Sequence, residues 1–152
     1  MSDMTILLKG FKGDIVTPSD PDYGESIARW ATNAIRNAKI IAFVKDSQDV
    51  SLAVKFARAS KLPLAIKGGG HSASGASSSE GGLVIDLSRH LRDVKVDAAN
   101  KLAYVGGGAI WADVEKATIR HGLASVGGTV NHTGVGGYVD FFQNPLVPVL
   151  CG

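Results

Sequence analysis

The sequence predicts an α+β fold made of two small subdomains, and three observations support this prediction. An apolar segment, a helical pattern and a second apolar segment follow one another between Ile40 and Ile66. Three short apolar segments with tight connections occupy residues 83–105. The chain also has 19 glycines in 152 residues, and many of them gather in a few loops. Clustered glycine without proline or serine repeats favours ligand-binding loops over disorder.

Residues 1–38 are expected to form an N-terminal segment with one long helix. Asp20 can cap this helix, and Pro21 suits its first turn. An apolar stripe at helical spacing predicts that the helix runs from about Tyr23 to Asn37. The stripe consists of Ile27, Trp30, Ala31, Ala34 and Ile35. We therefore expect Trp30 to lie in the core.

Residues 39–70 are expected to form the first subdomain. Ile40–Val44 is a continuous apolar run that predicts a buried strand, and Ser47 can cap the helix that follows. That helix should end near Pro63, where a second strand, Leu64–Ile66, begins. A strand–helix–strand unit of this length predicts two parallel strands joined by a right-handed crossover.

Residues 71–137 are expected to form the second subdomain. Its strands should be antiparallel, because their connections are too short for crossovers. A helix over Ile110–Arg120 should cover this sheet. Residues 138–152 follow neither a helical nor a strand period and remain unassigned. The three expected strands are Leu83–Leu87, Val94–Asp97 and Leu102–Val105.

Two glycine-rich loops carry the main functional signal. The first, residues 68–75, follows the strand that ends at Ile66, and the second spans residues 127–137. Glycine lets the backbone approach a ligand closely and point N–H groups at an anion. We expect the loops to lie side by side as two walls of one phosphate-bearing ligand site. Neither a P-loop nor a complete GxGxxG fingerprint occurs, and no helix is expected after Gly134.

His71 follows three consecutive glycines at a strand end. A histidine in a turn can simply cap the turn or face solvent, but this position favours a role beside a bound cofactor ring. His132 lies in the second glycine loop, where an approach to the cofactor and a plain hydrogen-bonding role are equally open.

Four motifs occur in the order found in one flavoprotein family: Lys67–Ser77, Gly82–Ser88, Val105–Trp111 and Gly127–Gly137. From about Ile40 to Gly137 the chain resembles the FAD-binding domain of the vanillyl-alcohol oxidase and p-cresol methylhydroxylase (PCMH-type) flavoproteins. It is most similar to the branch of berberine bridge enzyme-like oxidases.

This resemblance implies a PCMH-type fold, FAD as the cofactor, and a covalent bond from His71 to the 8α-methyl carbon of the flavin. It also implies oxidase-like hydride transfer from a small-molecule substrate, with dioxygen as the reoxidant. The catalytic residues are not identified. The residues that the resemblance places at the cofactor are Gly68, Gly69, Gly70, His71, Ser72, Gly75, Ser77, Gly127, Gly128, Thr129, Thr133, Gly134, Gly136 and Gly137.

The sequence departs from the family pattern in three respects. Val130 stands where some members have a cysteine that makes a second flavin link, so a double link is not expected. Tyr138–Phe142 replaces a further glycine-rich run. The family's downstream substrate domain has no counterpart in this sequence. We therefore expect this part alone to be inactive and to self-associate through exposed apolar surface; a flavin-binding remnant and a cofactor-free α/β module remain alternatives.

Composition excludes several other classes of function. The net charge is +2 and the basic residues are scattered, so nucleic acid is not an expected partner. No apolar stretch is long enough for a signal peptide or a membrane helix, which predicts a soluble cytoplasmic protein. Cys151 is the only cysteine, and no histidine pair has metal-ligand spacing with a carboxylate, so no disulfide or metal site is expected.

Overall fold

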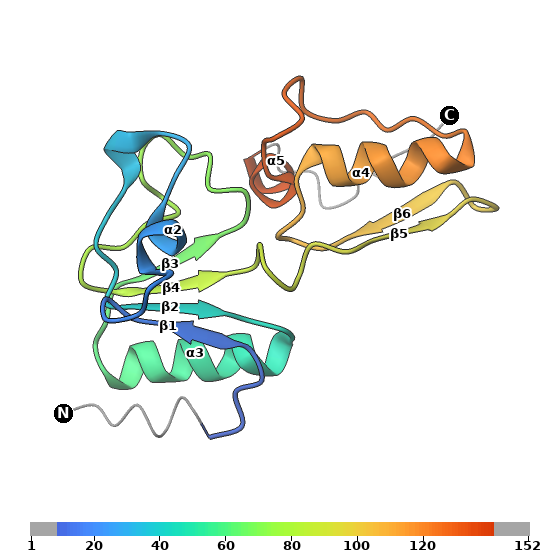
Figure 1. Ribbon diagram of the computed structural model, residues 1–152. Coiled ribbons are helices and arrows are strands. Elements are labelled where there is room, and N and C mark those ends of the chain that lie inside the picture. Colours follow the sequence, from blue (N-terminus) through green and yellow to red (C-terminus); the bar gives the residue numbers. More distant parts are fainter. Residues whose placement is uncertain (1–8, 142–152) are drawn as a thin grey trace.

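The computed structural model describes residues 9–141, which form two lobes (Figure 1). The first lobe is built on a four-stranded sheet with the order β1-β2-β4-β3. Strand β1 is antiparallel to β2, whereas β2 and β3 both run parallel to β4. The four strands are β1 (Asp14–Val16), β2 (Ile40–Phe43), β3 (Leu64–Lys67) and β4 (Leu83–Asp86).

Helices cover both faces of this sheet (Figure 1). On one face, Phe56 and two alanines of α3 (Ser47–Ala59) pack against β2 and β4. On the other face, α2 (Tyr23–Ile27) contributes Tyr23 and Ile27 to a second apolar cluster. Strand β4 lies between two neighbouring strands and is buried along its whole length. Each large aliphatic side chain buried in this way contributes about 1.5–3 kcal/mol.

Helix α3 begins one residue earlier than its expected cap suggests. The Asp46 carboxylate, rather than Ser47, caps the helix by accepting a hydrogen bond from the Asp49 N–H at 2.9 Å. The buried Asp49 carboxylate accepts in turn from the backbone N–H groups of Lys12 and Lys45, each at 2.9 Å. Asp49 therefore attaches the segment before β1 to the first turn of α3.

The long helix expected over Tyr23–Asn37 is wrong. Helix α2 ends at Ile27, Ala28 has an extended ψ of 144°, and only a short 3₁₀ turn, Thr32–Ala34, follows. Tertiary contacts explain the break, because the Trp30 N–H donates to the Gly70 carbonyl at 3.3 Å. The expected core position of Trp30 is also wrong, since 63% of this residue is exposed.

The placement of Leu83–Leu87 in an antiparallel sheet is wrong as well. The strand β4 in this region inserts between β2 and β3 and runs parallel to both. Strands β2 and β3 are therefore in one sheet and parallel, as the sequence predicts, but they are not neighbours. The first sheet therefore includes a strand, β4, that lies after residue 70 in the sequence.

The second lobe has a two-stranded antiparallel ribbon of β5 (Val94–Asp97) and β6 (Leu102–Val105), as predicted for these two strands. Helix α4 (Trp111–Thr118) packs on this ribbon and continues into a 3₁₀ turn that ends at Gly122, where φ is +66°. The Asp113 carboxylate accepts from the Ile110 N–H at 3.0 Å and so stabilises the start of α4.

A further helix, α5 (Val135–Phe141), begins inside the second glycine loop, where the sequence predicted none. Its Val135 side chain joins a buried cluster with Ala109, Trp111 and Val114, which explains why a glycine-rich segment becomes helical here. No helix among residues 9–141 has the length and apolar character needed to cross a membrane. The expected tail over residues 138–152 lies mostly outside the described residues.

Asp14 ties β1 to the loop after β4, and this contact predicts a pH effect. The His90 Nε2 lies 2.6 Å from the Asp14 carboxylate, and Arg89 lies 3.4 Å from it. The hydrogen bond from His90, aided by Arg89, holds the pKa of Asp14 below its ordinary value. A carboxylate with a lowered pKa stabilises the fold above its unfolded pKa of about 3.9, and this stabilisation is lost as the pH falls below that value.

We therefore expect Asp14→Asn to flatten the loss of stability in acid. The measurement is the urea midpoint from pH 7 down to pH 3, with Glu115→Gln on the exposed face of α4 as the control. Because the Asp14 side chain is 45% exposed, the difference should stay within about 1 kcal/mol. Parallel curves for the wild type and Asp14→Asn would contradict this assignment.

Candidate functional site

A cavity of about 1080 Å³ is lined by residues of both lobes and by both glycine loops. It opens at the carboxyl ends of β3 and β4, where parallel α/β sheets commonly bind ligands. Apolar walls come from β3, Leu87 and Tyr138. The loop residues that line the cavity are Gly68, Gly69, Gly70, His71, Ser72, Ala76, Ser77, Thr133, Gly134, Gly136 and Gly137.

The two loops lie side by side, as the sequence predicts, and their backbones touch. A Cβ built on Gly69 would lie 2.5 Å from the Gly134 nitrogen, and one on Gly134 would lie 2.6 Å from the Gly69 nitrogen. Gly68 and Gly136 both pack against the Gly107 carbonyl. A Cβ built on Gly68 would lie 2.8 Å from its oxygen, and one on Gly136 would lie 2.9 Å from it. Gly68, Gly69 and Gly134 are therefore needed for contact between the lobes, in addition to any role toward a ligand, whereas Gly136 allows close packing within the second lobe.

Some residues predicted for the site lie elsewhere. Gly75 and Thr129 do not line the cavity within the described part of the chain. Gly127 and Gly128 pack on the indole of Trp111, where an added Cβ would lie 2.5 and 2.8 Å from ring atoms. The first part of the second loop therefore supports the helix α4 side of the site and does not form its wall.

The cavity contains hydrogen-bonding groups that have no protein partner. Among residues 9–141, no acceptor engages the backbone N–H groups of residues 68–71. Gly70 has a φ of +69°, a left-handed conformation that glycine adopts freely. Ser77 also lines this cavity, although its hydroxyl oxygen is buried and has no hydrogen-bond partner among the described residues. These groups suit an anionic, polar ligand.

Arg29 holds the first loop against the N-terminal segment. Its Nε and Nη2 atoms donate to the Ser77 carbonyl at 3.2 and 2.7 Å, and Nη1 donates to the Ala28 carbonyl at 2.7 Å. Burial lowers the pKa of Arg29, and the charge of Asp86 partly counteracts this effect. The guanidinium thus fixes the position of Ser77, a residue that lines the cavity.

A buried ion pair lies beneath the first loop, at the carboxyl ends of β3 and β4. The Lys67 Nζ donates to Asp86 Oδ2 at 2.7 Å, and Asp86 is fully buried. Ser88 donates its N–H and hydroxyl to Asp86 Oδ1 at 2.8 and 2.6 Å. A Cβ on Gly70 would lie 3.2 Å from the Lys67 Cε, so the lysine side chain supports the loop directly.

His71 lines the cavity and contacts two other aromatic rings. Its Nε2 is 2.7 Å from the Nδ1 of His132, and the indole of Trp30 stacks on the imidazole at 4.9 Å between centroids. Burial, and to a lesser degree His132, hold the pKa of His71 below its ordinary value of 6.5. The imidazole is therefore neutral at neutral pH. No feature of the sequence indicated that Trp30 would lie at this site, because its spacing matches that of an apolar helix face.

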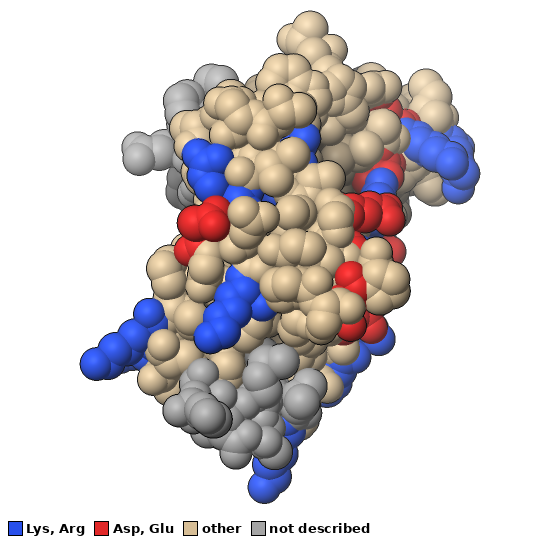
Figure 2. Space-filling model, turned by 60° about the vertical axis from the view of Figure 1, so that its left-hand side comes forward, with Lys and Arg blue, Asp and Glu red and all other residues tan. Residues whose placement is uncertain are grey.

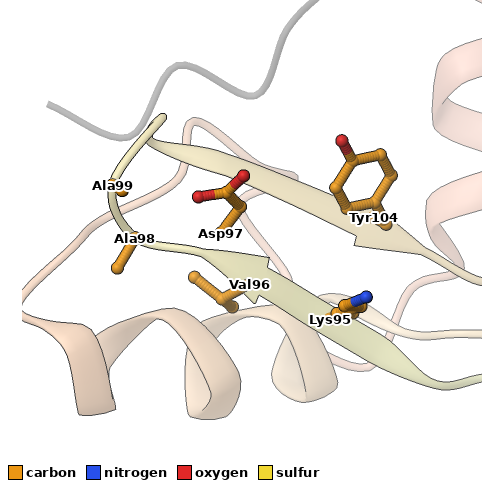
Figure 3. A pocket seen from close by; sticks show the side chains of 6 residues that line it. All are labelled: Lys95, Val96, Asp97, Ala98, Ala99 and Tyr104. Carbon is orange, nitrogen blue, oxygen red and sulfur yellow. The ribbon is translucent and has the colours of Figure 1, made fainter.

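Charges of both signs are interspersed over the face shown in Figure 2, with a broad uncharged area between them. A second hollow of about 710 Å³ lies on the β5–β6 ribbon, where Lys95 and Tyr104 stand on paired strands (Figure 3). Its carboxylate, on Asp97, is already engaged by the N–H and side chain of Asn100 at 3.1 and 2.8 Å. None of the residues predicted for the site lines this hollow.

Comparison with known proteins agrees with this geometry. A family model described as an FAD binding domain matches residues 38–140. The FAD-linked oxidoreductase pgmH of Aspergillus terreus is 39% identical over 139 residues, which cover 89% of this chain and 28% of that protein. The (R)-6-hydroxynicotine oxidase of Paenarthrobacter nicotinovorans is 30% identical over 117 residues, or 77% of this chain and 25% of that protein.

Solved structures show the same fold. The 6-hydroxy-D-nicotine oxidase of Arthrobacter nicotinovorans superimposes with a TM-score of 0.78 and 29% identity, over 82% of this chain and 27% of that one. A xylooligosaccharide oxidase from Myceliophthora thermophila, at 23% identity and a TM-score of 0.79 over 90% of this chain and 29% of that one, supports the fold alone. The chain spans about 28% of the length of the first curated relatives. It belongs to the FAD-binding domain family of the PCMH-type flavoproteins, whose members here are FAD-linked oxidoreductases.

Proposed function

We propose that the chain binds FAD in the cavity between its lobes, with the pyrophosphate at the first glycine loop. The observation that carries this proposal is the set of unpartnered donors at that loop, namely the backbone N–H groups of residues 68–71. An anion accepts hydrogen bonds from such donors without displacing any protein bond. The cavity volume of about 1080 Å³ suits a large cofactor.

We further propose that the flavin is joined covalently to His71 and to no second residue. His71 lines the cavity, and its lowered pKa keeps the ring neutral, so that one imidazole nitrogen has a free lone pair. Val130 offers no nucleophile for a second bond. When bound, FAD accepts hydride from a substrate carbon and passes the electrons to dioxygen, whereas the chain binds and orients it.

The activity of a whole protein with this domain is a wider proposal, that of an oxidase acting on a small molecule. It rests on the names of the relatives, such as a nicotine-derivative oxidase and an FAD-linked oxidoreductase. The described residues supply the cofactor side of such a site. We expect the chain alone to produce no hydrogen peroxide from alcohols, sugars or amines after loading with FAD.

The test of cofactor binding is direct. The purified chain is incubated with FAD, passed through a desalting column, and precipitated with acid. Flavin that remains with the precipitate is covalent, flavin released into the supernatant is bound without a covalent link, and a colourless protein contradicts FAD binding.

We expect His71→Ala to abolish covalent flavin while leaving the fold intact. The imidazole is partly exposed, and its contacts with Trp30 and His132 lie outside the apolar cores of both lobes, so the circular dichroism spectrum should match the wild type and the urea midpoint should change little. The control is His121→Ala, which changes an exposed histidine after α4, away from the cavity. Covalent flavin that persists in His71→Ala would show that another residue carries the link.

A further inference from the structure

His132 forms a specific pair with His71, and the proposed flavin link gives this pair a purpose. We propose that His132 is a positioning residue for flavin attachment: it fixes the orientation and tautomer of His71 and accepts the proton that His71 releases. This inference rests on the proposed function, because it concerns the histidine that is to carry the flavin.

Two contacts restrain the His71 ring. The Nε2–Nδ1 distance of 2.7 Å to His132 is that of a strong hydrogen bond, and the ring centroids are 4.7 Å apart. Trp30 stacks on the imidazole at an interplanar angle of 20°. Within residues 9–141, His132 is the single hydrogen-bonding partner of the His71 ring. The ring therefore cannot rotate without losing the bond, the stack, or both.

The pair also determines which nitrogen of His71 is reactive. A bond between two imidazole nitrogens contains one proton, so one ring donates and the other accepts. His132 is exposed, and water can satisfy an N–H at its outer nitrogen, Nε2, which leaves Nδ1 as the acceptor. His71 then carries its proton on Nε2, and its Nδ1 keeps the lone pair. In many enzymes, a neighbouring side chain holds a reactive histidine in one tautomer by a hydrogen bond, and here His132 would do this for His71.

The proton balance gives His132 its second task. Joining an imidazole nitrogen to the flavin methyl carbon removes one hydrogen from each, and the two electrons and two protons pass to dioxygen as hydrogen peroxide. As the Nδ1–C bond forms, positive charge develops on the His71 ring, and the Nε2 proton moves to His132. From there the proton reaches water, because His132 lies at the surface.

The pair exists only when the two lobes are closed. His71 and His132 are 61 residues apart in the sequence and belong to different loops. They meet because Gly69 and Gly134, each two residues from one of the histidines, allow the two backbones to touch. Attachment of the flavin is thereby restricted to the state in which both walls of the cavity are in place.

The first test needs no flavin. Nitrogen-15 NMR of the imidazoles in the 152-residue chain should show His71 protonated at Nε2, and His132→Ala should convert it to a mixture of tautomers. The matched control, His121→Ala, should leave the His71 signals unchanged. A His71 ring protonated at Nδ1 in the wild type, or one that does not respond to His132→Ala, would overturn the inference even if FAD binds.

The second test follows covalent attachment over time by flavin fluorescence in acid-denatured gels. His132→Ala should slow attachment on the order of 100-fold, as expected for loss of a general base, with an unchanged Kd for reversibly bound FAD. Free imidazole should partly restore the rate in His132→Ala, an effect that a merely structural role would not produce. An unchanged rate would refute the inference, whereas a wild type that never acquires covalent flavin would refute the proposed link to His71.

Discussion

Replacing Asp86 with alanine is expected to lower the free energy of unfolding by about 3–5 kcal/mol, because it leaves a lysine uncompensated in a mostly buried position. The Lys67 side chain is only 15% exposed and has Asp86 and Ser88 as its hydrogen-bond acceptors. Ser88 would lose an acceptor for its N–H and its hydroxyl at the same time. Urea unfolding of Asp86→Ala and wild type at pH 7 measures the difference.

Two variants make this measurement specific. Asp93→Ala removes an exposed carboxylate before β5 and should change the stability little. The double variant Lys67→Met with Asp86→Leu replaces the buried pair by apolar side chains and should recover most of the loss. A cost below about 1 kcal/mol for Asp86→Ala would place this pair among weakly contributing surface ion pairs and contradict its burial.

Gly69→Ala is expected to separate the two lobes. The new Cβ would meet the Gly134 nitrogen at 2.5 Å, and a backbone atom cannot move aside as a flexible side chain can. We expect a stability cost of about 1–3 kcal/mol from overpacking. We also expect loss of the His71–His132 hydrogen bond and of tight FAD binding.

The measurements for Gly69→Ala are FAD titration and hydrogen exchange at the two loops. Exchange at the first loop is followed at the Trp30 N–H, which donates to the Gly70 carbonyl, and exchange at the second loop is followed at the N–H groups of Thr133 and Val135, which donate to the Val130 and Ala109 carbonyls. Gly24→Ala is the matched control, because Gly24 lies in α2 and an added Cβ there meets nothing within 4 Å. Tight FAD binding by Gly69→Ala, with unchanged exchange in both loops, would show that the contact between the loops can be relaxed at no cost.

Local patterns were sufficient to predict β2, α3 and β3 of the first lobe and the contact between the two glycine loops. Continuous apolar runs predicted β2 and β3, and helical spacing predicted α3 between them. The two glycine loops could be paired because neither alone offers enough donors for a phosphate group. Their contact through Gly69 and Gly134 agrees with that reasoning, although the glycines serve the packing of the loops as well as the wall of the cavity.

The errors arose where long-range contacts override local preference. The apolar stripe that includes Trp30 has helical spacing, yet the segment is extended because Arg29 and Trp30 bind the first glycine loop. Three glycines in Gly134–Gly137 argued against a helix, but burial of Val135 against α4 stabilises α5. Neither the Gly70 carbonyl nor the α4 cluster can be located from the sequence near these residues.

The incorrect prediction of the strands that neighbour β4 has a different cause. Leu83, Val84 and Ile85 form a continuous apolar run, which is typical of a parallel strand buried on both faces. The short connections after Leu87 suggested an antiparallel sheet for the whole region. That prediction is correct for β5 and β6. Strand β4, however, pairs with β2 and β3, which come before the first glycine loop in the chain.

The strand order β1-β2-β4-β3 also has a consequence for how the chain assembles during its synthesis. When residue 67 leaves the ribosome, β2, α3 and β3 are all present, but β2 and β3 have no direct pairing with each other. The growing chain must keep Leu64 and Ile66 from wrong partners until Leu83–Asp86 emerges and joins the two strands. The first glycine loop lies within the stretch that is made during this interval, so this loop is anchored at both ends by the same event that closes the sheet.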